Sequence, residues 1–183
     1  MTHPVSRAAR VAPWIGAAIA ATALVLAPGA RAHATLEAAT AVAGTYHKLV
    51  LRVPHGCDGT PTTAVSITLP DGVTGAKPQP KAGWELKVRQ EKLAEPFRDA
   101  HGNVVADRPA EVTWSGGRLD DAFYDEFVVQ VRLPNRPGET LHFPSVQICE
   151  KGEHRWVEIP AAGQRPGALR APAPTLLLLP PRL

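Results

Sequence analysis

The sequence predicts an all-β protein whose strands form a β-sandwich. Short segments in which apolar and polar residues alternate recur along the chain, and this period of two is typical of half-buried strands. Turns rich in glycine and proline separate the segments, and the 183 residues include 15 Gly and 19 Pro. No long apolar pattern with a helical period is present, so we expect one sandwich rather than a mixed fold.

Each predicted strand has one apolar face. The clearest alternation places Trp84, Leu86 and Val88 on one face, with charged residues between them. Pro144 lies inside a predicted strand, which indicates an edge position or a bulge because proline cannot donate a hydrogen bond to a neighbouring strand. The predicted strands are residues 45–53, 65–69, 84–89, 112–114, 127–133, 140–149 and 155–159.

Two stretches lie outside this pattern. Residues 91–110 are polar and interrupted by Pro96 and Pro109, so we expect a surface loop, with a small hairpin as the alternative. Residues 161–183 are rich in Pro, Gly and Ala, and their leucine run is too short to span a membrane. We interpret them as a Pro-rich C-terminal tail, laid on the sandwich or partly disordered, which leaves residues 33–160 as the sandwich domain.

The N-terminus has the pattern of a secretory signal peptide. Two arginines precede an apolar run at residues 15–27, and a Pro-Gly pair ends this run before small residues. The favoured cleavage follows Ala32, so that residues 1–32 are removed and His33 becomes the first residue. Cleavage after Ala34 is the alternative. Export to the periplasm, with no stable membrane anchor after cleavage, is therefore predicted.

The charge balance argues against nucleic acid as a partner. The chain has 20 Lys and Arg against 17 Asp and Glu, but three of its arginines precede residue 33 and no acidic residue does. The predicted mature chain is therefore neutral, whereas binding to nucleic acid depends on clustered excess basic charge.

The two cysteines, Cys57 and Cys149, are predicted to form a disulfide. They are the only pair in the chain, and an oxidising compartment favours the bond. The alternative is a thiolate metal site in which Cys149 and His154 are ligands, as in blue-copper proteins. Such a site usually has an axial Met, and the only methionine is the initiator.

Two histidines are candidate metal ligands. If His33 is the first residue, its α-amine and its ring Nδ1 can chelate one ion, and this pair of nitrogens favours Cu(II). A terminal histidine without function is the alternative. His55 follows a predicted strand at the start of a loop, where ligands are often placed, and it is the second candidate; a simple turn residue is its alternative.

Several motifs in order resemble the YcnI-like family of exported bacterial copper-binding proteins. The resemblance implies an immunoglobulin-like or cupredoxin-like sandwich with a mononuclear Cu(II) site on the N-terminal histidine. Its quoted stretches are Val53-Pro54-His55-Gly56-Cys57, Pro61-Thr62-Thr63, Lys77-Pro78-Gln79-Pro80, Gly83-Trp84, Trp114-Ser115-Gly116-Gly117, Tyr124-Asp125-Glu126-Phe127 and Phe143-Pro144-Ser145-Val146-Gln147.

The chain departs from that family pattern at two positions of the implied site. Where the resemblance implies a glutamate, this sequence offers His55 or Asp58, and Phe143 stands in the expected place of a tryptophan. The predicted function is a periplasmic Cu(II) carrier or buffer, not an enzyme, that passes copper to a membrane importer or a cuproenzyme assembly factor. The alternatives are a copper monooxygenase, with His55 or His142 as its second histidine, and a metal-free structural sandwich.

Overall fold

The computed structural model describes residues 33–98, 101–164 and 168–181, and this part of the chain is all-β. The predicted signal peptide and its cleavage site precede His33, so they lie outside the described residues. No helix among the described residues is long and apolar enough to cross a membrane. The predicted fold class is confirmed, since twelve strands account for the regular structure of the described residues.

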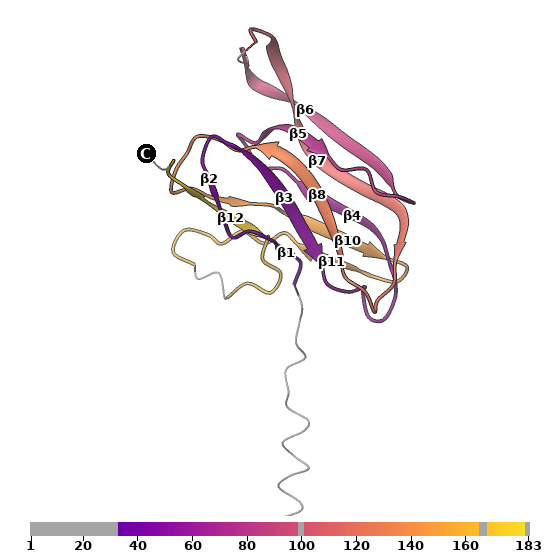
Figure 1. Ribbon diagram of the computed structural model, residues 1–183. Helices are drawn as coiled ribbons and strands as arrows, with labels where there is room; N and C mark the ends of the chain where they lie inside the picture. Colours follow the sequence, from indigo (N-terminus) through magenta and orange to yellow (C-terminus); the bar gives the residue numbers. More distant parts are fainter. Residues whose placement is uncertain (1–32, 99–100, 165–167, 182–183) are drawn as a thin grey trace, which may run out of the picture. The chain divides into compact units, whose positions relative to one another are not determined.

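Two sheets form the layers of the sandwich (Figure 1). The first, called here the β3 sheet, has four strands in the order β1-β3-β8-β5, and the second, the β4 sheet, has five in the order β11-β10-β4-β7-β6. The strands of the β3 sheet are β1 (Thr35–Leu36), β3 (Tyr46–Val53), β8 (Asp125–Arg132) and β5 (Thr74–Pro78). Those of the β4 sheet are β11 (Glu153–Trp156), β10 (Ser145–Cys149), β4 (Thr62–Thr68), β7 (Val104–Leu119) and β6 (Glu85–Arg98).

A third, smaller sheet includes a strand from the Pro-rich tail. β12 (Thr175–Leu179) lies between β2 (Thr40–Val42), to which it is parallel, and β9 (Thr140–His142), to which it is antiparallel. Leu176 and Leu178 of β12 are completely buried in the core. The end of the tail thus adds apolar side chains to the same core as the rest of the chain.

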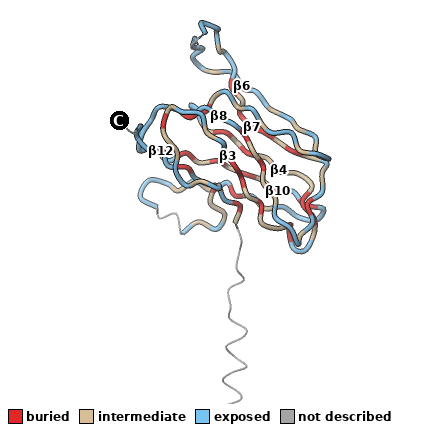
Figure 2. The backbone as a smooth tube through the Cα atoms, viewed as in Figure 1, coloured by how far each residue is buried: buried red, intermediate tan, exposed pale blue. Residues whose placement is uncertain are grey.

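The core fills the space between the two layers, and buried positions alternate with more exposed ones along β7 and β8 (Figure 2). Leu49 and Leu51 of β3 are completely buried, as is Val112 of β7. Aromatic contacts join the sheets, because the rings of Trp114 on β7 and Phe127 on β8 meet edge-on with centroids 5.3 Å apart. Edge-on packing is a favoured arrangement of aromatic rings in protein cores.

Two first expectations about the connections are wrong, although the hairpin named as the alternative for residues 91–110 is present. Residues 91–110 do not form a surface loop, because β6 and β7 continue through most of this stretch as a long hairpin. Pro109 is tolerated because the pairing register shifts beside it, between Arg89 and Gln90. Residues 140–149 are not one strand, since they divide into β9 and β10 at Pro144, where the proline interrupts pairing.

A buried arginine fastens this hairpin to the sandwich. The Arg108 guanidinium on β7 donates to Glu91 of β6 at 2.6 Å and to the backbone oxygen of Leu69 at 2.9 Å, and it lies 2.8 Å from an Asp71 oxygen. Arg108 is only 8% exposed. Its charge is therefore matched by two carboxylates, as a buried charge requires.

His47 on β3 gives the fold a dependence on pH. Burial lowers the pKa of His47, and the nearby Glu37 carboxylate raises it by less. Because the ordinary histidine pKa is about 6.5, the unfolded chain takes up more protons than the folded one below that pH, so stability falls on acidification. We expect His47→Gln to reduce the loss of Tm between pH 7.5 and pH 5.5. An identical loss of Tm in both proteins would contradict this role.

Candidate metal site at one end of the sandwich

The two predicted ligands, His33 and His55, lie beyond the same end of the β1–β3 pair. These strands are antiparallel, with Thr35 opposite Arg52, so the chain before β1 and the loop after β3 leave the sheet at the same end. Figure 1 shows β1 and the arrowhead of β3 close together at the lower end of the sandwich. The fold therefore places two histidines that are 22 positions apart in the sequence beyond the same end of this strand pair.

The imidazole of His33 has one nitrogen engaged and one available. Its Nε2 lies 3.3 Å from the backbone oxygen of Arg170. A carbonyl oxygen can only accept a hydrogen bond, so this contact places the ring proton on Nε2 and the lone pair on Nδ1. The same backbone segment is anchored by Glu158, whose carboxylate accepts from the N–H groups of Arg170 and Ala171 at 2.8 and 2.9 Å.

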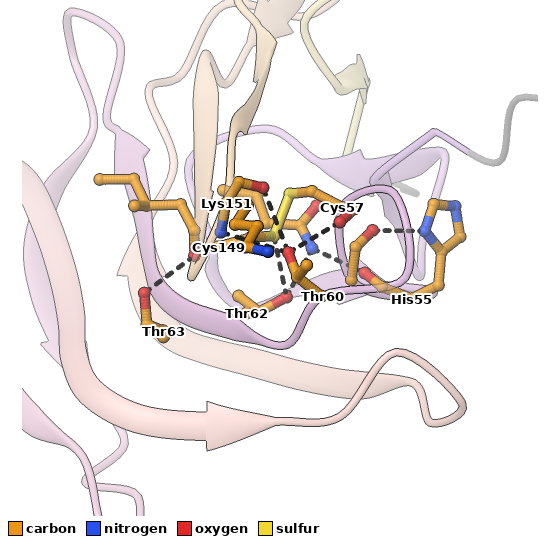
Figure 3. The surroundings of a disulfide bond; sticks show 10 residues. His55, Cys57, Thr60, Thr62, Thr63, Cys149 and Lys151 are labelled. Carbon is orange, nitrogen blue, oxygen red and sulfur yellow. Dashed lines mark hydrogen bonds between the residues drawn. A yellow bond between two sulfur atoms is a disulfide. The ribbon is translucent and has the colours of Figure 1, made fainter.

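His55 shows the complementary arrangement. Its Nδ1 lies 2.6 Å from the backbone oxygen of Gly56, so Nδ1 carries the proton and Nε2 carries the lone pair (Figure 3). The backbone of His55 is also fixed, because its carbonyl oxygen accepts from the Gln147 side-chain amide at 2.6 Å. Ligand histidines in proteins commonly donate their second ring N–H to a carbonyl in this way.

The predicted disulfide between Cys57 and Cys149 is present, and Cys57 lies two residues after His55 in the same loop (Figure 3). It joins the loop after β3 to the end of β10, with Cα atoms 5.9 Å apart. The alternative thiolate site is excluded, because both sulfurs are in the bond. Gly56 has no room for a side chain, since a Cβ there would overlap the backbone oxygen of Thr60.

Thr60 fastens the same loop to the turn between β10 and β11. Its N–H donates to the Cys57 oxygen at 2.9 Å, and its hydroxyl donates to the Lys151 oxygen at 3.1 Å. With the disulfide, these bonds hold the His55 loop against the β4 sheet. His55 therefore sits on a fixed loop rather than on a free one.

A third histidine, His154, lies beside His55. The two ring centroids are 6.2 Å apart with the ring planes at 89°, and the ring of Trp156 packs 5.4 Å from that of His154 at 37°. The sequence predicts a role for His154 only as a partner of Cys149 in a thiolate site. The separation of His154 from His55 in the sequence does not indicate that their rings are in contact, because the contact depends on the pairing of β11 with β10.

The other predicted site residues make no hydrogen bond, ion pair or ring contact with His33 or His55 in the described part of the chain, and they occupy their own places in the fold. Phe143 is completely buried in the core, and Asp58 is exposed with a left-handed backbone, φ 47°. His142 is at the end of β9, opposite Thr175 of β12. Among the described residues, no group of three or more His, Cys, Asp or Glu side chains is close enough to hold a metal ion.

These observations define an immunoglobulin-like sandwich in which the rings of His55 and His154 are in contact. A crystal structure described as an uncharacterized protein from Nocardia farcinica with an immunoglobulin-like fold is 31% identical to the chain, with a TM-score of 0.58. The match covers 80% of this chain and 98% of that one, and no curated protein matches. The family described as a domain of unknown function, DUF1775, matches residues 33–178. The chain therefore belongs to this family, which is the domain of YcnI-like proteins.

Proposed function

We propose that the chain, once processed to begin at His33, is an exported Cu(II)-binding protein that carries or buffers copper. In this proposal copper is cargo, which the protein passes to a membrane importer or a cuproenzyme assembly factor, and the protein catalyses no reaction. A ligand at the first residue suits transfer, because it lies at the edge of the domain where an acceptor can exchange ligands.

The observation that carries the proposal is the orientation of the His33 ring. The contact of Nε2 with the Arg170 oxygen leaves Nδ1 with its lone pair, and Nδ1 is the nitrogen that can chelate one ion together with the amine of the same residue. Copper has the highest affinity for nitrogen ligands among the divalent first-row metals. The amine is a backbone group that exists only when His33 is the first residue. A search for groups of three ligand side chains therefore does not include it.

His55 supports the proposal as the second ligand. Its Nε2 has the lone pair that a metal needs, and its Nδ1 proton is held by the Gly56 oxygen. It leaves the β3 sheet at the same end as His33. A nitrogen-rich set without methionine sulfur favours Cu(II) over Cu(I), and methionine is absent after the initiator residue.

A Cu(II) titration of the chain beginning at His33 tests the function. We expect one ion per chain, and we expect His55→Gln to weaken binding by roughly tenfold to a hundredfold, by analogy with changes around metal ligands. His47→Gln is the matched control, because His47 lies at the opposite end of β3. Weak, non-stoichiometric binding by the unmodified chain, or equal losses in both variants, would contradict the proposal.

A further inference from the structure

We propose that Glu158 is a positioning residue for His33. It acts through residues 170–174 of the C-terminal tail, called here the tail segment, and it determines which ring nitrogen of His33 is free to bind metal. The inference deepens the proposed function and rests on His33 being a copper ligand. Glu158 follows β11 of the β4 sheet, whereas His33 precedes β1 of the β3 sheet.

The first step is the contact between the tail segment and the His33 ring. The backbone oxygen of Arg170 lies 3.3 Å from Nε2 of His33. Because a carbonyl oxygen can only accept a hydrogen bond, this contact holds the ring proton on Nε2 and leaves the lone pair on Nδ1. Nδ1 is the nitrogen that closes a chelate with the amine of the same residue. The position of one backbone oxygen therefore affects the proposed chelate directly.

All three backbone N–H groups of the tail segment donate to Glu158. The other two residues of the segment are prolines, which have no N–H. The N–H groups of Arg170 and Ala171 donate to one carboxylate oxygen, Oε2, at 2.8 and 2.9 Å. The N–H of Ala173 donates to the backbone oxygen of Glu158 at 2.9 Å, and Glu158 donates its own N–H to the Ala171 oxygen at 3.0 Å. One residue thus holds the whole segment.

The carboxylate of Glu158 is well suited to hold two amides. Hydrogen bonds to an ionised carboxylate are shorter and roughly twice as strong as those between neutral groups. The side chain is half-buried and lines a hollow of about 250 Å³, together with the apolar residues Leu169 and Pro172. Within the described part of the chain, the two N–H groups engage this carboxylate and no basic side chain does.

The two ends of the tail segment are held differently. At its far end, the Phe143 N–H donates to the Pro174 oxygen at 2.8 Å, and β12 begins at the next residue. At its near end, which faces His33, the Glu158 carboxylate holds both N–H groups of Arg170 and Ala171. Loss of the carboxylate should therefore release the near end and leave the far end in place.

The test uses three variants of the chain that begins at His33. Glu158→Ala removes the acceptor, whereas Glu158→Gln removes the charge but keeps an amide oxygen that can accept from both N–H groups. Glu139→Ala is the matched control, because Glu139 pairs with Arg136 at 2.9 Å and does not hold the near end of the segment. Circular dichroism and the Tm of the metal-free variants check that they fold.

We expect Glu158→Ala to change the metal-free protein first. The amides of Arg170 and Ala171 should exchange with solvent roughly tenfold faster or more, because local opening becomes easier. The Ala173 amide should stay protected, since its acceptor is a backbone oxygen. Nuclear magnetic resonance of the His33 ring nitrogens should show the proton shared between both nitrogens rather than held on Nε2.

We expect Cu(II) affinity to follow the same order. Glu158→Ala should weaken binding roughly tenfold, the lower end of the range of about 10–100-fold for groups that support a ligand from behind. Glu158→Gln and Glu139→Ala should bind as the unmodified chain does. Rescue by glutamine is the result that a positioning role requires, because the amide oxygen keeps the backbone in place without a charge.

The outcomes separate this inference from the proposed function. Slow exchange at Arg170 and Ala171, with the ring proton still on Nε2 in Glu158→Ala, would overturn the positioning role. Equal loss of Cu(II) affinity in Glu158→Gln and Glu158→Ala would also overturn it, because the charge of Glu158 would then explain the effect. Exchange and the ring proton are measured without copper, so they decide the inference even if the unmodified chain binds no copper, which is the failure of the proposed function.

Discussion

One alanine added before His33 is expected to weaken Cu(II) binding more than about a hundredfold, nearly as much as His33→Ala. The added residue converts the amine of His33 into an amide, which has no lone pair for a metal unless it loses its proton. The chelate then has only Nδ1, and the loss of a ligand should exceed the cost of about 10–100-fold seen for changes behind a ligand. Isothermal titration or competition with a copper chelator measures the affinity.

The same chelate predicts a dependence on pH. The α-amino group has an ordinary pKa of about 7.7–8.0, so the proton that copper must displace costs about tenfold in affinity per pH unit below that range. Binding should therefore weaken steeply on acidification, and the chain with the added alanine should show a shallower slope.

The control for this experiment is the extended chain itself. It retains every side chain of the sandwich, so its Tm should equal that of the chain beginning at His33. Equal Cu(II) affinity in the two chains would show that the amine is not a ligand. N-terminal mass analysis of the exported protein is the companion measurement, and a chain that starts at Thr35 would contradict the proposed site.

Removal of the disulfide is expected to have the largest effect on stability. Cys57 and Cys149 are 92 positions apart in the sequence, and in the chain-entropy model a bond that closes so long a loop adds about 4–5 kcal/mol to the free energy of unfolding. The double variant Cys57→Ala, Cys149→Ala should lose about this amount. Urea unfolding, monitored by tryptophan fluorescence, measures it.

The comparison for the disulfide is the unmodified protein with and without a reductant. Reduction should shift the urea midpoint of the unmodified protein toward that of the double variant, and it should leave the midpoint of the double variant unchanged. A midpoint of the unmodified protein that does not respond to complete reduction would contradict the predicted stabilisation. Because the bond also holds the His55 loop, we expect Cu(II) affinity to fall in the double variant.

The sequence by itself determined which segments form the regular, half-buried strands of the sandwich. The period of two in residues 45–53 and 127–133 predicts β3 and β8, because half-buried strands must alternate. The disulfide followed from the cysteine count and the predicted oxidising compartment, since Cys57 and Cys149 are the only pair. The proposal that His33 is a ligand rests on its place after a signal-peptide pattern. All of these depend on local pattern or on composition.

Tertiary structure alone decided where the less regular strands pair. Four leucines in succession, residues 176–179, have no alternation to read, yet in β12 they alternate between buried and exposed because neighbours cover one face. The β6–β7 hairpin likewise continues past Pro109, because a shift of register absorbs a residue that cannot donate a hydrogen bond. In both cases, the partner strand supplies the information that the local pattern lacks.

The site follows the same division. His33 and His55 could be predicted from the sequence as candidate ligands, because His33 follows a signal-peptide pattern and His55 begins the loop after a predicted strand. The pairing of His55 with His154 could not, since it depends on three separate contacts to β10: the disulfide, the Gln147 amide and the β11 register. Such contacts join residues that are far apart in the chain, so only the folded arrangement brings the imidazoles together.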